Sequence, residues 1–184
     1  MKDKNLFDSD FIKKVLEIYN FDINNLDIKE INYVHMNDYK FSSYNNPFLL
    51  TFNLQCCVAV YLYGNRFGFL AHINTTKGNL APVFFDVNNN EFLLSDLILE
   101  KLKSYCDYSG KYDDFYIGMV LGSNPYSDDY YIMDSINKGM HNLIKKADLY
   151  SINVQLNDRF ILPDFIIDTK NNEFISPNVK IKMR

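Results

Sequence analysis

Two strand-like runs separated by a short turn constrain the fold of this chain more than any other feature. The segment reads CVAVYLYGNRFGFLAH and extends from Cys57 to His72. Gly64-Asn65 lies between the two runs, and both residue types tolerate the positive φ that a two-residue hairpin loop requires. With this pair as the loop, Cys57 lies directly opposite His72, with Cβ atoms about 4.5–5.5 Å apart. The sequence therefore predicts a hairpin that brings a thiol next to an imidazole.

The two faces of the predicted hairpin differ in character. One face is uniformly apolar and is the natural core face; it carries Val58, Val60, Leu62, Phe67, Phe69 and Ala71. The other face is mixed and carries Cys57, Ala59, Tyr61, Tyr63, Arg66, Gly68, Leu70 and His72. In this register the small residues Ala59 and Gly68 lie diagonally across from each other on this face. Their small size predicts a shallow opening beside the Cys–His pair.

Strand-like segments predominate in the rest of the chain. They are Ile28 to His35, Phe48 to Leu54, Phe115 to Leu121, Leu149 to Leu156, Phe160 to Ile167 and Glu173 to Ile181. Helical spacing runs from Asp8 or Ser9 to Tyr19, from Ser95 or Asp96 to Tyr105, and from Asp128 to Lys146. This pattern predicts an α+β fold, a layered α/β sandwich with a mostly antiparallel mixed sheet flanked by two or three helices. Because no linker or repeat interrupts the chain, we expect one domain over residues 1–184.

Charge and hydropathy exclude several classes of partner. Lys and Arg number 19 against 23 Asp and Glu, for a net charge of -4, whereas a nucleic-acid binder needs a basic face. No apolar run reaches the roughly 18 residues of a membrane helix, and no secretory signal is visible. We therefore expect neither nucleic acid nor membrane as a partner. A cytoplasmic location is the default, and export as an effector without a cleaved signal is the alternative; nothing indicates an oligomeric state.

The cysteines and histidines point to nucleophilic chemistry rather than to disulfides or metals. The three cysteines, Cys56, Cys57 and Cys106, are odd in number and include an adjacent pair, which is not a disulfide framework. His35 and His141 have no partner at metal-ligand spacing, so we expect no metal and no organic cofactor.

A thiol beside an imidazole can form a thiolate–imidazolium pair, which is a strong nucleophile. A third group must orient the imidazole. Thr51 is the candidate, because it lies six residues before Cys57, an even offset that returns it to the same side. Cys and His are also ordinary core residues, so a purely structural pair stays open at this point.

The same residues resemble a known family. The run Thr51-Phe-Asn-Leu-Gln-Cys-Cys57-Val-Ala-Val, followed by Gly68-Phe-Leu-Ala-His72, is similar to the active-site stretch of the CheD chemoreceptor glutamine deamidases. The necrotizing-factor deamidase toxins have Leu-Ser-Gly-Cys where this chain has Leu54-Gln55-Cys56-Cys57. The resemblance implies a CheD-like fold over about residues 46–184, with about residues 1–45 as an extension unlike the family. It also implies that Cys57 is the nucleophile, His72 the base and Thr51 the orienting residue.

The expected function is a cysteine-dependent protein glutamine deamidase that acts through a thioester. Its partner would be a protein with an exposed glutamine, in a chemotaxis or a bacterial effector or toxin setting. Other Cys–His amidohydrolases and transglutaminases use the same pair of groups and remain open. Gln55 and Cys56 replace small residues before the nucleophile, so an inactive protein-binding module without an oxyanion hole is a further alternative.

Overall fold

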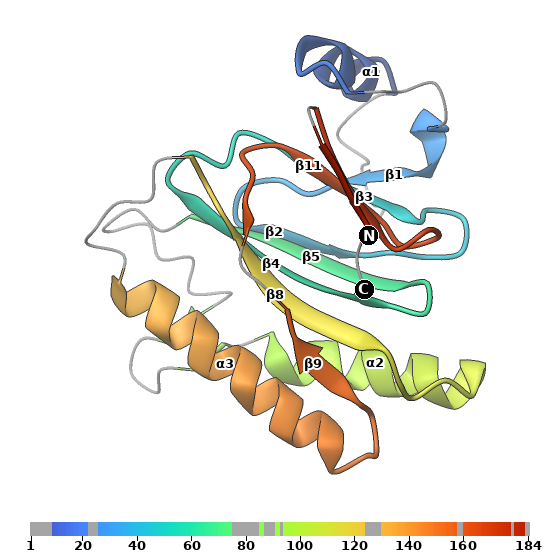
Figure 1. Ribbon diagram of the computed structural model, residues 1–184, viewed down its shortest axis with the longest axis vertical. Helices are drawn as coiled ribbons and strands as arrows, with labels where there is room; N and C mark the ends of the chain where they lie inside the picture. Colours follow the sequence, from blue (N-terminus) through green and yellow to red (C-terminus); the bar gives the residue numbers. More distant parts are fainter. Residues whose placement is uncertain are drawn as a thin grey trace, which may run out of the picture.

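Four layers make up the fold, with two β-sheets stacked face to face between helices (Figure 1). The computed structural model describes residues 9–21, 26–74, 85–86, 91–92, 94–123, 130–157, 160–177 and 179–182. The helices are α1 (Ser9–Ile18), α2 (Ser95–Ser109) and α3 (Tyr130–Asp148), with a short 3-10 helix η1 (Ile28–Glu30). This arrangement confirms the α+β sandwich class. The expected helix starts at Asp8 and Asp128 lie outside the described residues.

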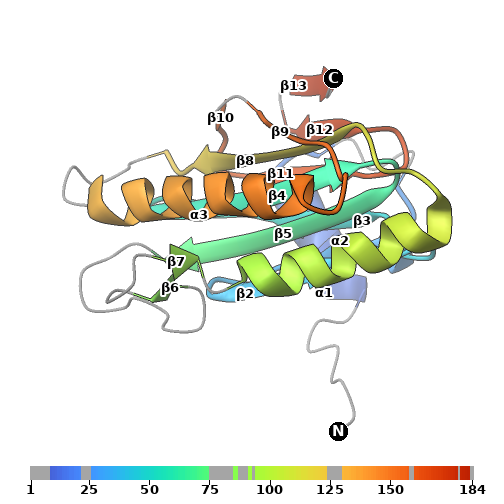
Figure 2. The ribbon, with the colours of Figure 1, turned by 90° about the horizontal axis from the view of Figure 1, so that it is seen from below.

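The central sheet contains the predicted hairpin. Its order is β10 (Phe160–Ile161), β8 (Phe115–Leu121), β4 (Cys57–Gly64), β5 (Phe67–Asn74) and β2 (Asp38–Phe41), and β9 (Val154–Leu156) also pairs with β8. The pairs β2–β5, β5–β4 and β4–β8 are antiparallel, whereas β9 and β10 run parallel to β8. Figure 2 shows α2 and α3 side by side across one face of this sheet.

The outer sheet covers the opposite face of the central sheet. Its order is β1 (Ile31–Tyr33), β3 (Phe48–Thr51), β11 (Phe165–Asp168), β12 (Glu173–Ser176) and β13 (Val179–Lys182). A separate two-stranded hairpin consists of β6 (Phe85–Asp86) and β7 (Glu91–Phe92). On the far side of the outer sheet, apolar residues of α1 such as Leu16 pack against Leu50 and Ile166. The described part of the first 45 residues thus belongs to the same folding unit.

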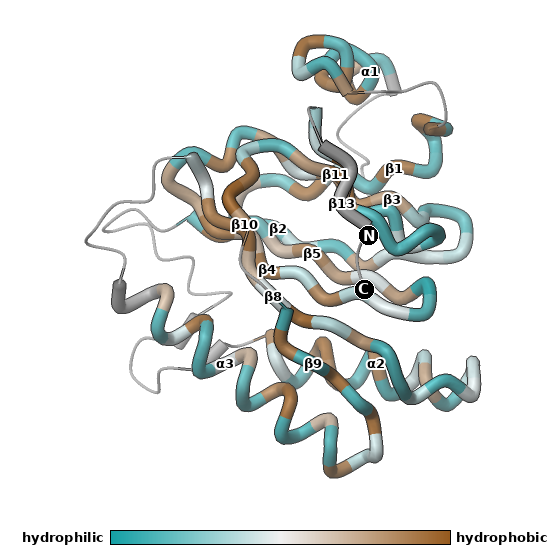
Figure 3. Tube along the Cα trace, in the orientation of Figure 1, coloured by the Kyte–Doolittle hydropathy of each residue, from teal (hydrophilic) through white to brown (hydrophobic). Residues whose placement is uncertain are grey.

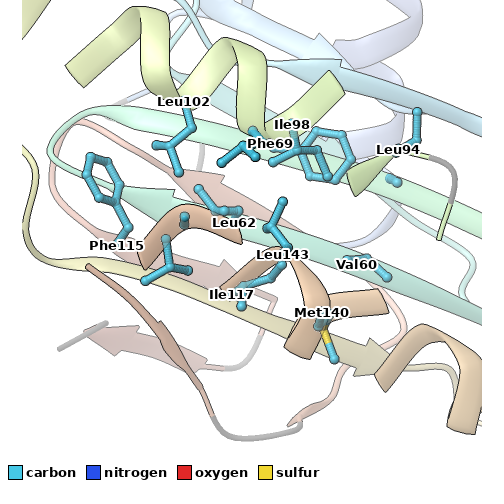
Figure 4. Close-up of a cluster of buried hydrophobic side chains, with 14 of the residues drawn as sticks. Val60, Leu62, Phe69, Leu94, Ile98, Leu102, Phe115, Ile117, Met140 and Leu143 are labelled. Carbon is cyan, nitrogen blue, oxygen red and sulfur yellow. The ribbon is translucent and has the colours of Figure 1, made fainter. Parts of the chain in front are cut away.

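The largest core lies between the central sheet and the helix pair α2 and α3 (Figure 4). The apolar face that the sequence singled out, including Val60, Leu62 and Phe69, packs there against Ile98 of α2 and Leu143 of α3. Figure 3 shows hydrophobic and hydrophilic residues alternating along α3, as expected for a helix with one buried side. Each fully buried aliphatic or aromatic side chain contributes roughly 1.5–3 kcal/mol to stability.

A second core fills the space between the two sheets, and it corrects the expectation of a single sheet. The mixed face of the hairpin is buried here as well, with Tyr61 and Leu70 packed against Phe165 and Phe174. The Tyr61 and Phe174 rings meet edge to face with centroids 4.9 Å apart. The strands divide between two sheets because both faces of the hairpin carry enough apolar surface to need a cover.

Two segments that the sequence predicts as single strands are each divided. Pro163 interrupts the segment from Phe160 to Ile167, so that β10 joins the central sheet and β11 the outer sheet. Proline has no N–H to donate to a ladder, and the break lets the chain cross between the sheets. The segment from Glu173 to Ile181 forms the antiparallel pair β12 and β13. No helix among the described residues has both the length and the apolar character to cross a membrane.

Candidate functional site

The hairpin of β4 and β5 turns at Asn65-Arg66 and not at Gly64-Asn65. Asn65 and Arg66 have φ values of 49° and 70°, as a two-residue hairpin turn requires. Gly64 instead closes β4, and a Cβ atom there would collide with the carbonyl oxygen of Asp114 and lie 2.9 Å from the Cα of Phe115. Glycine at this position lets the backbone at the start of β8 pack closely against β4. The local sequence does not reveal this contact.

This turn changes the pairing of the predicted dyad. His72 lies opposite Ala59, and Cys57 lies opposite Asn74, so the prediction that Cys57 and His72 are directly opposed is wrong. The register moves by two residues, and a shift of two keeps every side chain on its face. Cys57 and His72 are therefore diagonal neighbours on one face, a relation that typically separates residues by about 7–8 Å.

Thr51 and His72 form a hydrogen bond that joins the two sheets. Thr51 ends β3 in the outer sheet and His72 lies in β5 of the central sheet. Thr51 Oγ1 is 2.9 Å from His72 Nδ1. Both side chains are buried, His72 with 3% of its surface exposed. The contact between Thr51 and His72 is present as predicted, but it crosses between two sheets instead of following the face of one strand.

The hydrogen-bond geometry determines which ring nitrogen of His72 carries the proton. Thr51 Oγ1 also lies 3.1 Å from the carbonyl oxygen of Val34, which can only accept. The single hydroxyl proton is therefore donated to Val34, and His72 Nδ1–H donates to Thr51. In the neutral ring the lone pair is then on Nε2. Among the described residues this buried Nε2 has no hydrogen-bond partner, a cost of about 1–3 kcal/mol.

Burial keeps the His72 ring neutral. Desolvation, with a smaller effect from nearby His35, lowers the pKa of His72 from 6.5 to about 4. His35 follows β1 and meets the edge of the Tyr33 ring, with centroids 4.2 Å apart; burial lowers its pKa too, and Asp38 opposes that shift. At neutral pH the His72 ring is therefore neutral, and the lowered pKa makes it a weak base. Its imidazolium form requires a negative partner such as a thiolate.

The loop before Cys57 is held in one conformation by contacts from two other segments. Asn53 has a φ of 60°, and its N–H donates to Asp164 Oδ1 over 2.7 Å. The next N–H, from Leu54, donates to the carbonyl of Pro163 over 2.9 Å, and the Leu54 carbonyl accepts from Ser123 N–H over 2.9 Å. These bonds order the backbone that leads to the thiol.

Close packing before the nucleophile depends on a glycine that is distant in sequence. Gly122 N–H donates to the carbonyl of Cys57 over 3.0 Å, and a Cβ atom on Gly122 would lie 2.7 Å from the carbonyl carbon of Gln55. The atoms that approach Gly122 belong to the backbone of Leu54 and Gln55 and not to a side chain; Gln55 is exposed and Cys56 is half-buried. The sequence around Gly122 gives no sign of this role beyond its place at the end of an apolar strand.

Among the described residues around the pair, the small side chains do not leave the shallow opening that the sequence predicts. Cys57 has 5% of its surface exposed, and Ala59 is fully buried opposite His72. Gly68 lies opposite Tyr63, and a Cβ atom on Gly68 would collide with the methyl group of Thr169. The outer sheet occupies the space that the small side chains leave, which a single hairpin cannot show. The resting site is consequently closed.

The described residues contain no group of three or more His, Cys, Asp and Glu side chains arranged to hold a metal ion. The chemistry available at the site is that of the thiol, the imidazole, the hydroxyl and the backbone amides of the loop. No model of a known protein family matches the chain, and a search of curated proteins gives no match.

Proposed function

We propose that this chain is a cysteine-dependent protein glutamine deamidase with Cys57 as nucleophile, His72 as base and Thr51 as orienting residue. One observation carries the proposal. Thr51 holds the Nδ1–H of a buried histidine, and this leaves an unpartnered Nε2 lone pair, within the described structure, on the same face as a cysteine. That is the arrangement in which an imidazole accepts the proton of a thiol.

The reaction uses each of these groups in turn. Cys57 transfers its proton to His72 Nε2, and the thiolate attacks the carboxamide carbon of a glutamine side chain. Backbone amides next to Cys57 stabilise the oxyanion; those of Asn53 and Leu54 already donate to Asp164 and Pro163. His72 returns the proton to the amide nitrogen, the C–N bond breaks, and ammonia leaves a thioester. Water, deprotonated by His72, then attacks the thioester and releases glutamate with the thiol restored.

The closed resting site makes access part of this mechanism. Cys57 and His72 are buried and lie diagonally across the hairpin, so a protein substrate has to open the region around them. Catalytic hydrogen bonds are often long in the resting state and tighten in the complex. Thr51 retains Nδ1–H in both protonation states of the ring, which keeps Nε2 directed to the same place throughout.

A catalytically inactive binding module of the same fold is the alternative that burial of the site favours. Another Cys–His amidohydrolase or a transglutaminase would use the same three residues, with an amine replacing water in the last case. The alternatives differ in the product: a carboxylate, an amine adduct, or no covalent change at all.

The test is a search for deamidated glutamine in a bacterial protein extract incubated with the purified chain. Deamidation adds one dalton and one negative charge to the modified peptide. The Cys57→Ser variant should produce no such peptide, whereas Cys56→Ser, the matched control one residue away, should retain the activity. Equal deamidation by Cys57→Ser would refute the nucleophile assignment. A mass gain that requires added amine would identify a transglutaminase.

A further inference from the structure

A pocket opens at the turn end of the β4–β5 hairpin, which is the end farther from Cys57 and His72. Its volume is about 390 Å³, within the roughly 300–1,000 Å³ of small-molecule sites. The β4–β5 turn, the loop after β2, the end of α2 and the turn after β11 contribute its walls, on the right-hand side of Figure 1. Arg66 lines the pocket, and Cys57 lies at the other end of β4, more than about 20 Å away along the strand.

The floor and one wall of the pocket are fixed by packing and hydrogen bonds. Thr169 donates from Oγ1 to the carbonyl of Pro47 over 2.8 Å, and its N–H bonds the same oxygen over 3.1 Å; both residues are buried. Tyr105 forms the wall, with its hydroxyl bonded to the carbonyl of Asn65 and its ring 5.4 Å from that of Phe67. A ligand would therefore enter a preformed site, which lowers the cost of binding.

The charge of the lining favours an anion. Arg66 and Lys170 line the pocket and are exposed. Within the described part of the chain neither residue forms an ion pair. Glu30 is the one acidic residue of the described lining. Two cationic residues and one acidic residue give the described lining a net charge of +1, in a protein with a net charge of -4, and a guanidinium presents a fork of donors that matches phosphate.

The backbone conformation of Arg66 gives a second, independent indication. Its φ of 70° places a long side chain at the second position of the hairpin turn, where Asn-Gly is the favoured sequence. A residue other than glycine pays a steric cost in this region, and such outliers cluster at functional sites. Arginine is thus present at a position where glycine would suit the turn better, and its side chain lines the pocket.

We propose that this pocket binds a small phosphorylated ligand with a flat ring, of the nucleoside monophosphate class. The phosphate contacts Arg66 and Lys170. The ring stacks on Tyr44 or Tyr108, which line the pocket with 88% and 92% of their surfaces exposed; nucleobases stack readily on such rings. The site is distinct from the deamidase residues and does not depend on their function.

The test compares three probes by calorimetric titration of the full chain: adenosine monophosphate, adenosine and inorganic phosphate. We expect adenosine monophosphate to bind at least about tenfold more tightly than either of the others. Equal affinity for inorganic phosphate would overturn the ring contact. Absence of binding at millimolar concentration would overturn the site.

Variants separate the site from general effects on folding. Arg66→Gly should weaken binding at least about tenfold and at the same time raise the melting temperature, because glycine suits the turn. Lys170→Ala should also weaken binding. Lys101→Ala, which removes an exposed lysine of α2 outside the lining, should bind as the unmodified chain does. Unchanged affinity in Arg66→Gly would contradict the proposal.

Discussion

Acidification should destabilise the folded protein through His72, and the magnitude follows from the burial of this one imidazole. Its pKa is about 4 in the folded state against 6.5 for an unperturbed histidine. As the pH falls through 6.5 the unfolded chain binds a proton here, and the folded chain binds one only near pH 4. The free energy of unfolding therefore decreases between these values and levels off below about pH 4. A difference of about 2.5 pKa units corresponds to a loss of about 3 kcal/mol, a large share of typical stabilities of 5–15 kcal/mol.

Urea unfolding of the unmodified chain and of His72→Gln, measured at several pH values between about 7 and 4.5, isolates this contribution. Among the described residues, His35 and Asp164 also have perturbed pKa values that affect the stability at acidic pH. Burial lowers the pKa of His35, which adds to the loss, and raises the pKa of Asp164, which opposes it. Both groups are present in the unmodified chain and in His72→Gln, so their contributions largely cancel when the two free energies of unfolding are subtracted. If His72→Gln loses as much stability on acidification as the unmodified chain, His72 is not a buried neutral base, and the reasoning fails.

Three further predictions test the site and its supports. Thr51→Val leaves a buried imidazole N–H without an acceptor, so the free energy of unfolding in urea should fall by about 1–3 kcal/mol. Thr51→Ser keeps the hydroxyl and should lose much less. Equal losses in the two variants would contradict the hydrogen bond. Gly122→Ala forces a Cβ to within 2.7 Å of the backbone of the loop before the nucleophile and should cost more than about 2 kcal/mol. A Cβ atom at Gly110 would meet nothing within 4 Å among the described residues, and the new side chain only has to tolerate a φ of 69°. Gly110→Ala should therefore cost about 1 kcal/mol. If Gly122→Ala is no less stable than Gly110→Ala, the close contact at Gly122 is refuted. Burial raises the pKa of Cys106 to about 11, so iodoacetamide should label this thiol only after unfolding, and rapid labelling of the native chain would show that the residue is accessible.

Several features of the fold and the site follow from local sequence. Alternation along the hairpin identified the apolar face that packs on α2 and α3, because side chains of a strand alternate between faces. Helical spacing identified α3, which extends to Asp148. Both of these inferences depend only on a period of the backbone. The even offset from Cys57 named Thr51 as the partner of His72, but the contact itself comes from the stacking of β3 in the outer sheet against β5.

Tertiary structure decided the rest, because the deciding contacts come from segments far away in the chain. Local sequence favours Gly64 as a turn residue, but the backbone of β8 approaches it so closely that only glycine fits, and the turn moves to Asn65-Arg66. The loop before Cys57 depends on Asp164 and on Gly122. The outer sheet covers the mixed face of the hairpin, where the small residues Ala59 and Gly68 predicted an opening. Periodicity shows which residues share a face, but only the packed structure shows what lies against that face.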